Sequence, residues 1–552
     1  MSSPITPCAK TALVFLGSLS LTASATADHD IEYGKGPLHW AKHIVVIYME
    51  NHSFDNLYGT WEPINGAKVN GLSNADAAHT NQIGQFDAPY NCLLQNDPHL
   101  TSPSPLATNC QDRTTDTLFN SAFTNQPFQI TPYIPVESPT RDLVHRFYQE
   151  QYQINDGRQN RYVTGSDAVG LSMGYYDTTT LPIYKYLHSK HAPNYIVLDN
   201  FFQGTFGGSF LNHQWLITAR APLFIGAVND GTSNDLHSVV DANGMPNNYP
   251  LYKSPIGVLV KDATLTASCN PPAGRPATPS NVVCGDYAIN TIQPKAQPYA
   301  PGTAAAKQLP PLTTLTIGDL LTQANIDWAW YSGGWDNAAG NVNGPGWTNG
   351  NNGVSCTDPN VIADASYPYC ADKLFQFHHQ AFNYYAAYAP GTKARARHLR
   401  DEEEFIQAAK KGKLKAISFV KPLGEENEHP GYATVSEGSQ HLVDLIKAVE
   451  DGPNAEHTLI IVTYDEFGGS WDHVPPPGQG GVAGIHDRFG PGTRVPALLV
   501  SKRFKNSTVD HTQYDTSSIL ATIERRFGLK SLGERDNAVE DLSKAVGTVI
   551  PK

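Results

Sequence analysis

The sequence predicts an α/β fold, a three-layer α/β/α sandwich around a mostly parallel central sheet with loop-rich insertions. Two observations support this prediction. First, the chain contains short, nearly continuous apolar runs, which are typical of parallel strands covered on both faces. Second, helical patterns lie between these runs, so that strand and helix alternate along the chain. A chain of 552 residues is long enough for one large domain with insertions or for two to three ordinary domains.

Each predicted strand is an apolar run, and each predicted helix has apolar residues at helical spacing. Two stretches rich in Pro, Gly and Asn, 222–312 and 333–372, are expected to be loop insertions or a small cap on a single domain spanning 28–552. The strands are predicted at 43–49, 194–202, 326–332, 414–422, 457–465 and 495–501, and the helices at 209–221, 399–413, 441–451 and 516–528.

The first 27 residues resemble a secretory signal peptide. They contain one lysine, Lys10, then an apolar run at 12–21 and small residues before a cleavage site predicted after Ala27. A membrane anchor is the alternative, but the run is well short of the roughly 20 residues that a span needs. We therefore expect a periplasmic or extracellular protein without stable membrane insertion.

The cysteines are expected to form disulfides in such an oxidising compartment. Of seven cysteines, Cys8 lies in the leader and six remain. A zinc site is the alternative, but the tighter C-x-x-C pairs that it would favour are absent. Proximity in the sequence favours three short-loop pairs among the fifteen possible pairings: Cys92 with Cys110, Cys269 with Cys284, and Cys356 with Cys370.

The net charge is −13 with histidine neutral, and it becomes 38 − 52 = −14 without Lys10 of the leader. Such an acidic surface disfavours nucleic acid as a partner. A small phosphorylated substrate bound in one local site remains compatible with it.

Acidic and amide side chains follow two predicted strands directly. Ligands of open α/β sheets bind beyond the carboxyl ends of the strands. Glu50 and Asn51 follow the run at 43–49, and Asp465 and Glu466 follow the run that begins at 457. These oxygen ligands suit one hard divalent ion, such as Ca²⁺, Mg²⁺, Mn²⁺ or iron. The alternative is that the acids cap helices or pair with arginine.

A glycine-rich turn, GTFGGSF, precedes the predicted helix 209–221 and places Ser209 in its first turn. The unpaired N–H groups and positive dipole end of a helix stabilise both an alkoxide and a bound anion there. A nearby metal would activate the hydroxyl without a catalytic triad. Thr205 in the same turn is a rival nucleophile, and a plain N-cap is the structural alternative for Ser209.

Histidines supply the third signal, since the chain has 20 of them. An imidazolium can hold phosphate oxygens and protonate a leaving alcohol, although a single histidine is more often structural. Four lie in polar, aromatic-flanked stretches: His145, His378, His379 and His429.

The run MENHSFDNLYG resembles the opening motif of the bacterial phosphoesterase family of secreted acid phosphatases and phospholipases C, a branch of the alkaline phosphatase-like superfamily. Further similar stretches extend in the family's order from about residue 40 to 530. They are DLVHRFYQEQYQINDG, GGSFLNHQWLI, NEHPGYATVSEGSQHL, VTYDEFGGSWDHVPPP, DRFGPGTRVPALLVS and VDHTQYDTSSILATIERRFG.

The resemblance implies the family's fold and site. Ser209 would be the nucleophile, Glu50, Asn51, Asp465 and Glu466 would bind the metal, the four histidines would face phosphate or act as acid and base, and Asp336 would belong to the same shell. In the phospholipase C branch the nucleophile turn resembles GPT-x-PNR. Here GGSFLNH has Ser209 in place of Thr and His213 in place of Arg, which favours the acid phosphatase branch.

The expected reaction is hydrolysis of phosphomonoesters through a covalent phosphoserine, with the histidines charged below about pH 6.5. A phospholipase C that cleaves phosphodiester head groups is the alternative enzyme. A secreted binding protein that has lost catalysis is the alternative from another class. The sequence leaves the oligomeric state open.

Overall fold

The computed structural model describes residues 36–550 except 85, 95–107, 113–116, 122, 226–235, 242–243, 246–262, 272–276, 290, 292–308, 349–371 and 373. The predicted signal peptide and much of the two predicted insertions lie outside the described residues. So do Cys8, Cys356, Cys370 and the side chain of Cys110.

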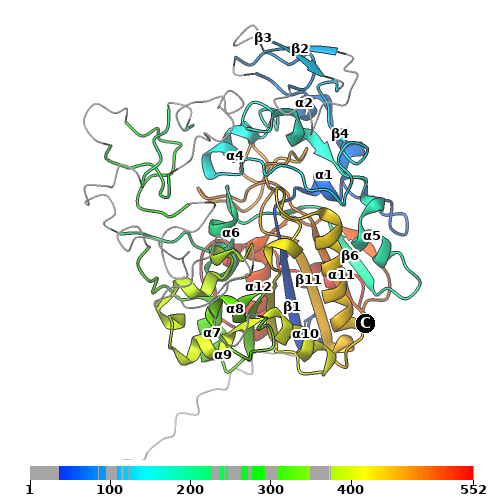
Figure 1. The fold of residues 1–552 in the computed structure, drawn as a ribbon, viewed down its shortest axis with the longest axis vertical. Coiled ribbons are helices and arrows are strands. Elements are labelled where there is room, and N and C mark those ends of the chain that lie inside the picture. Colours follow the sequence, from blue (N-terminus) through cyan, green and yellow to red (C-terminus); the bar gives the residue numbers. More distant parts are fainter. Residues whose placement is uncertain are drawn as a thin grey trace, which may run out of the picture.

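A mostly parallel sheet of eight strands forms the centre of the molecule (Figure 1). All six predicted strands belong to it, so the predicted α/β class is confirmed. Only β12 runs antiparallel to its neighbours, β11 and β6. The strand order is β13 (Thr508–Asp510), β6 (Asn194–Leu198), β12 (Ala497–Ser501), β11 (Thr458–Tyr464), β1 (His43–Met49), β10 (Ile417–Lys421), β8 (Trp328–Ser332) and β9 (Leu399–Asp401).

Strand β1 lies between β11 and β10, and its apolar residues are fully buried because both faces of the sheet are covered. The pairing of β1 with β11 runs in register from His43 opposite Thr458 to Met49 opposite Tyr464. The two strands therefore end at the same level, and the residues that follow them emerge side by side.

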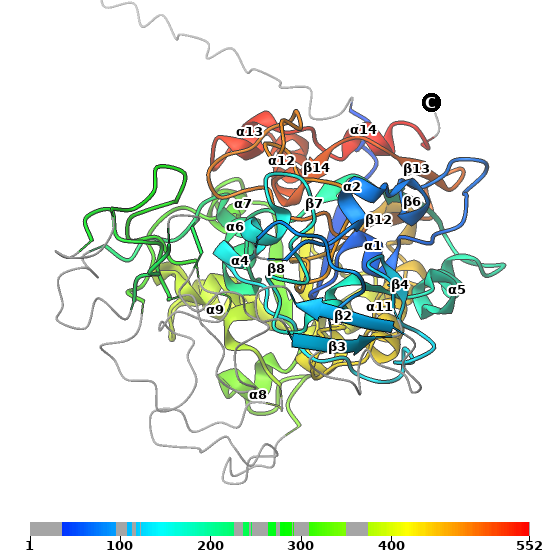
Figure 2. The same ribbon diagram turned by 90° about the horizontal axis from the view of Figure 1, so that it is seen from above.

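Helices cover both faces of the sheet (Figures 1 and 2). On one face α11 packs against α5 and α10, and on the other α6 packs against α12 and α7. Their bounds are α5 (Pro182–Leu187), α10 (Glu402–Lys410), α11 (Val435–Glu450), α6 (Ser209–Thr218), α7 (Ile317–Gln323) and α12 (Thr516–Phe527).

Two predicted helix starts were wrong, each for a local reason. Helix α11 begins at Val435, six residues before the predicted start, because the Thr434 hydroxyl accepts the Glu437 N–H and caps the first turn. Helix α10 begins at Glu402, because residues 399–401 pair with β8 as strand β9.

The remaining elements are short. The helices are α1 (Phe54–Leu57), α2 (Ala77–Thr80), α4 (Phe147–Ile154), α8 (Trp335–Ala339), α9 (Lys393–His398), α13 (Arg535–Ala538) and α14 (Ser543–Val546). The strands are β2 (Thr108–Asp112), β3 (Thr117–Ser121), β4 (Phe128–Gln129), β5 (Gly174–Tyr175), β7 (Phe201–Phe202) and β14 (Tyr514–Asp515).

Two further sequence predictions can be compared with the structure. Cys269 and Cys284 form a disulfide with their Cα atoms 4.9 Å apart, which confirms that pair. Cys92 is also disulfide-bonded. Within the described part of the chain, every helix is too short or too polar to cross a bilayer.

Helices α10 and α11 are joined by a histidine between carboxylates. His441 Nε2 lies 3.1 Å from Glu402 Oε2 and 3.6 Å from Glu426 Oε2. Burial alone would lower the pKa of His441, but Glu402, Glu426 and Asp444 outweigh it and raise the pKa to about 9. Because the folded-state pKa exceeds the unfolded value, the ion pairs stabilise the fold fully below about pH 6.5 and are lost as the pH rises through about 9.

We expect the His441→Gln variant to lack this pH dependence. The wild type should lose up to about 3 kcal/mol of unfolding free energy between pH 6.5 and 9.5 through this group, since one pKa unit corresponds to 1.36 kcal/mol. Urea unfolding at several pH values measures the effect, and His457→Gln, which replaces an exposed histidine, is the control. Equal pH slopes for wild type and His441→Gln would contradict the prediction.

Candidate functional site

The ends of β1 and β11 meet as the parallel register requires. Glu50, Asn51, Asp465 and Glu466 are all fully buried there. The Asn51 backbone N–H donates to Asp465 Oδ1 at 3.1 Å, and Asn51 has a left-handed φ of 63°. Gly468 fits closely against this bend, because a Cβ at that position would lie 2.1 Å from the Asn51 carbonyl oxygen.

Three oxygens in this group accept no hydrogen bond from the described residues: Asn51 Oδ1, Asp465 Oδ2 and Glu466 Oε1. Burial, with the neighbouring Glu50 charge, raises the pKa of Asp465 well above its usual range. Burial, with the Asp465 charge, does the same for Glu466. Buried oxygens without donors are costly unless a cation compensates them, so this set could hold a hard divalent ion.

Lys421, which sequence reasoning missed, supplies a positive charge to the group. It is the last residue of β10 and is fully buried. Its Nζ contacts Glu50 Oε1 and donates to the Tyr48 carbonyl oxygen at 3.0 Å. Its place at the end of a predicted apolar run was the available signal, since β10 is the neighbour of β1 on the other side.

Ser209 is the first residue of α6, and its hydroxyl donates to Glu50 Oε2 at 3.1 Å. The N-cap is Gly208, so Ser209 does not have the plain capping role. The rival Thr205 is buried, and its hydroxyl has no hydrogen-bond partner among the described residues. The Ser209 hydroxyl therefore points toward the acidic residues at the ends of β1 and β11, and the Thr205 hydroxyl makes no such contact.

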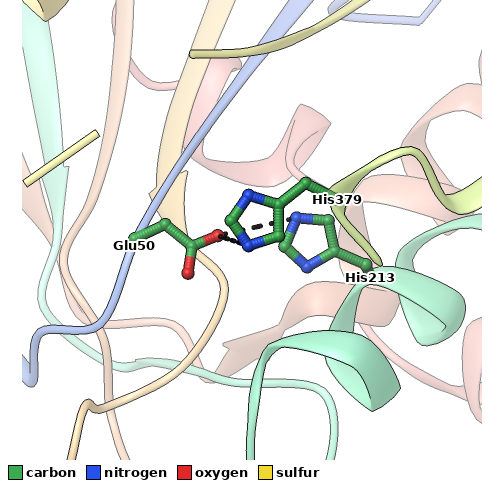
Figure 3. A group of neighbouring side chains, drawn as sticks. All are labelled: Glu50, His213 and His379. Atoms are coloured by element: carbon green, nitrogen blue, oxygen red, sulfur yellow. Dashed lines mark ion pairs between the residues drawn. The ribbon is translucent and has the colours of Figure 1, made fainter. Parts of the chain in front are cut away.

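Two stacked imidazoles also face Glu50 (Figure 3). His379 Nε2 lies 3.2 Å and His213 Nε2 3.7 Å from Glu50 Oε1, and the ring centroids are 4.7 Å apart. His213 Nδ1 donates to the Ser209 carbonyl oxygen at 2.7 Å, which leaves Nε2 toward the cluster. The sequence prediction did not assign His213 to the site. Its position four residues after Ser209, on the same face of the helix, was the signal that could have identified it.

Two other predicted histidines contact Asn51. The Asn51 side-chain amide donates to His429 Nε2 at 2.8 Å and to His145 Nε2 at 3.3 Å. His145 Nε2 also lies 3.4 Å from Glu466 Oε1. The His378 ring contacts the ring of His379, with centroids 4.4 Å apart. The four predicted histidines thus lie next to Glu50, Asn51 and Glu466, either directly or, for His378, through contact with His379.

The pKa values of the site histidines are lower than the sequence analysis expected. Burial lowers the pKa of His145 to about 4 and that of His378 to about 3. It also lowers the pKa of His213, His379 and His429 well below the usual range, with Lys421 adding repulsion. The expectation that the site histidines carry charge just below pH 6.5 is therefore wrong for the protein alone, because desolvation penalises the imidazolium.

Asp336 is not among these contacts. It lies in the first turn of α8, where Oδ1 accepts a hydrogen bond from the Asn341 side chain and Oδ2 one from the Gly346 N–H. Both carboxylate oxygens of Asp336 thus bind the loop after α8. The backbone N–H of Asp336 donates to Asp401. Within the described residues, these contacts of Asp336 are with the loop after α8 and with Asp401, and none is with the histidines beside which Asp336 was predicted to act.

The acids behind the strand ends pair with arginine. Arg494 Nε lies 3.0 Å from Asp472 Oδ1, and Arg494 Nη2 lies 3.0 Å from Asp55 Oδ1. His473 Nδ1 lies 2.6 Å from Asp55 Oδ2. This buried network joins the segments that follow β1 and β11.

The fold and the site together define an α/β protein in which the first serine of a helix, Ser209, faces carboxylates and histidines at the ends of the central strands. The chain belongs to the phosphoesterase family, whose profile matches residues 41–530.

Curated relatives share short regions with the chain. It is 31% identical over 153 residues to non-specific phospholipase C6 of Arabidopsis thaliana, covering 23% of this chain and 29% of the relative. It is 35% identical over 160 residues to non-specific phospholipase C4 of the same plant, covering 24% and 29%. Phospholipase C B of Mycobacterium tuberculosis strain H37Rv is 31% identical over 169 residues, covering 27% and 32%. The matches span about a third of each relative.

Solved structures show a weaker likeness. A protein of the alkaline phosphatase superfamily from Vibrio parahaemolyticus has 12% identity and a TM-score of 0.21 over 41% of this chain and 51% of its own. A structure described as a sulfatase, from Bacteroides thetaiotaomicron, has 10% identity and a TM-score of 0.28 over 68% and 73%.

Proposed function

We propose that this phosphoesterase family member hydrolyses phosphate esters through a covalent phosphoserine on Ser209. One observation carries the proposal: the Ser209 hydroxyl opens a helix and donates to Glu50 Oε2 beside three buried oxygens that have no donor among the described residues. A phosphate placed at Ser209 would lie at the positive end of the α6 dipole, which favours an anion.

Glu50, Asn51, Asp465 and Glu466 would hold one divalent cation, and their oxygen-only chemistry admits Ca²⁺, Mg²⁺, Mn²⁺ or iron. The orphaned oxygens of Asn51, Asp465 and Glu466 fit such an ion. When bound, the ion would supply positive charge that favours the serine alkoxide and offsets the charge of the phosphate.

The chain's own residues account for the proton and bond changes. Ser209 Oγ attacks phosphorus, its proton passes to Glu50, and the bond to the leaving alcohol breaks as a histidine protonates that oxygen. Water then attacks phosphorus as the histidine takes back a proton from it, the bond to Ser209 Oγ breaks, and Glu50 returns its proton to that oxygen. The released product is phosphate from a phosphomonoester and phosphocholine from phosphatidylcholine. A bound phosphate anion would offset the burial cost of an imidazolium, because a neighbouring opposite charge favours the charged form.

Two substrate classes share this chemistry. The relatives are named phospholipases C, which favours phosphodiesters with phospholipid head groups as the first class. The second candidate, phosphomonoesters, is favoured by Ser209 and His213, which stand in the nucleophile turn where the phospholipase C pattern has Thr and Arg. In this structure His213 faces Glu50 directly.

Turnover of the two classes separates the candidates. We expect phosphatidylcholine dispersed in detergent to yield phosphocholine, with a kcat/KM at least about tenfold above that for p-nitrophenyl phosphate, which would correspond to about 1.4 kcal/mol of preferential transition-state binding. The reverse ratio would assign the chain to phosphomonoesters. Hydrolysis of neither substrate by protein with its metal bound would count against phosphoester hydrolysis as the function.

A further inference from the structure

Glu150 lies at the centre of a buried network beside the turn that carries Ser209. It is on α4, five residues after His145, and is fully buried. Glu150 Oε2 accepts the Gly207 N–H at 2.5 Å and the Gln203 side-chain amide at 2.9 Å. Glu150 Oε1 accepts the Thr493 N–H at 2.7 Å and contacts the Thr493 hydroxyl at 2.9 Å. These contacts tie the nucleophile turn to the segment before β12.

A carboxylate suits this place and an amide does not. Each oxygen of Glu150 faces a backbone N–H, one from Gly207 and one from Thr493. A glutamine in either orientation would point its NH₂ group at one of these donors and leave that donor unpaired. A buried unpaired donor costs about 1–3 kcal/mol, so the turn would shift to relieve it.

Gln203 extends the network to the metal-ligand segment. Its amide nitrogen donates to Glu150 Oε2 and to the Thr205 carbonyl oxygen at 2.7 Å. Its amide oxygen accepts the N–H of Phe467, the residue after Glu466, at 2.9 Å. The orientation of Gln203, which Glu150 fixes, therefore sets the turn at 204–208 and the segment after β11 relative to one another.

The backbone packs closely around the Glu150 network. Gly207 has a left-handed φ of 88°, and a Cβ there would lie 2.7 Å from the Phe147 backbone nitrogen at the start of α4. A Cβ on Gly492 would lie 2.5 Å from Glu150 Oε1. Helix α4 and the nucleophile turn thus touch through backbone, and the hydrogen bonds of Glu150 lock that contact.

We propose that Glu150 is a positioning residue that holds the Ser209 turn in register with the segment carrying Asp465 and Glu466. The inference rests on the proposed function of Ser209. Among the contacts of the described residues, Glu150 itself touches neither Ser209 nor the strand-end oxygens. It acts through Gly207 and Gln203, so its loss should lower the rate of the chemical step without removing the metal ligands.

The test is the Glu150→Gln variant beside wild type, Ser209→Ala and a matched control, Glu524→Gln. Glu524 is a buried carboxylate on α12 whose Oε1 accepts the Leu532 N–H, away from the Ser209 turn. For Glu150→Gln we expect kcat with p-nitrophenyl phosphate and with phosphatidylcholine to fall about 10- to 100-fold, as for a misplaced reacting group. KM should change less than about threefold and metal per chain should stay at the wild-type value. Glu524→Gln should keep wild-type kcat.

A second measurement does not depend on activity. Amide hydrogen exchange of peptides covering 203–210 and 465–469 should be faster in Glu150→Gln than in Glu524→Gln. Unchanged exchange in both segments, or a kcat equal to that of Glu524→Gln while Ser209→Ala is inactive, would overturn the inference and leave the proposed function standing. A wild type inactive on both substrates would remove the proposed function, and the exchange data would still decide whether Glu150 holds the turn. If Glu150→Gln does not fold, the fallback variant is Thr493→Val, which removes the hydroxyl contacts to Glu150 and Tyr162 and keeps the backbone N–H contact to Glu150. It should show a smaller fall in kcat of the same kind, and wild-type values in that variant would overturn the inference.

Discussion

Replacing Ser209 by alanine should lower kcat on the order of 10⁴-fold or more, while the fold and the metal content stay as in the wild type. The hydroxyl is the group proposed to form the covalent intermediate, and loss of a nucleophile leaves only binding and electrostatic contributions to the rate. The side chain is small and its hydroxyl donates to Glu50, so the structural cost of removing it should be modest. Steady-state kinetics, metal analysis and thermal unfolding of the purified variant measure the three quantities.

The control for this variant is Ser418→Ala. Ser418 is a fully buried serine in β10 whose hydroxyl has no partner in the described part of the chain. It should keep wild-type kcat. Near-normal turnover by Ser209→Ala would refute the assignment, and loss of turnover in Thr205→Val instead would transfer the role to Thr205.

Replacing Asp465 by asparagine should remove the metal and the activity together. Asp465 Oδ1 accepts the N–H groups of Asn51 and Glu466, so an asparagine oxygen can keep those bonds while its NH₂ group takes the place of Oδ2, which has no partner among the described residues. An amide nitrogen offers a cation no lone pair and no negative charge. We expect metal content to fall from about one ion per chain to about a tenth of that, and kcat to fall about 10³-fold or more.

Metal analysis after dialysis and kinetics before and after metal addition test this prediction. Chelation of the wild type should reproduce the loss, and adding back the divalent ion should restore the wild type but not Asp465→Asn. Glu524→Gln serves again as the control for loss of a buried carboxylate. Full activity of exhaustively chelated wild type would exclude the cation from the proposed mechanism.

Much of the site could be predicted because it follows from local sequence and one rule of architecture. The apolar runs before Glu50 and Asp465 form strands wherever both faces are buried, and parallel neighbours end at a common edge. The glycine-rich turn before Ser209 likewise marks a strand-to-helix junction by itself. These local features are sufficient to predict that Glu50, Asn51, Asp465, Glu466 and Ser209 lie together.

The remaining contacts depend on partners distant in the sequence, and no local pattern specifies them. Lys421 pairs with Glu50 only because β10 lies next to β1, and the Asp336 carboxylate is taken up by the loop after α8. The histidine pKa values also escaped prediction, because they reflect the burial that the assembled sheet edge imposes on each ring.

The amino-acid sequence by itself therefore determined the α/β class and the chemical types collected at the sheet edge, since both follow from short-range apolar periodicity. Only the tertiary structure decided which charge faces which oxygen, that β12 runs antiparallel, and that Glu150 links the nucleophile turn to the segment after β11. The physical reason is that the energies of ion pairs and the cost of burying charge depend on distances between side chains. For residues hundreds of positions apart in the sequence, the packing of the folded chain sets those distances.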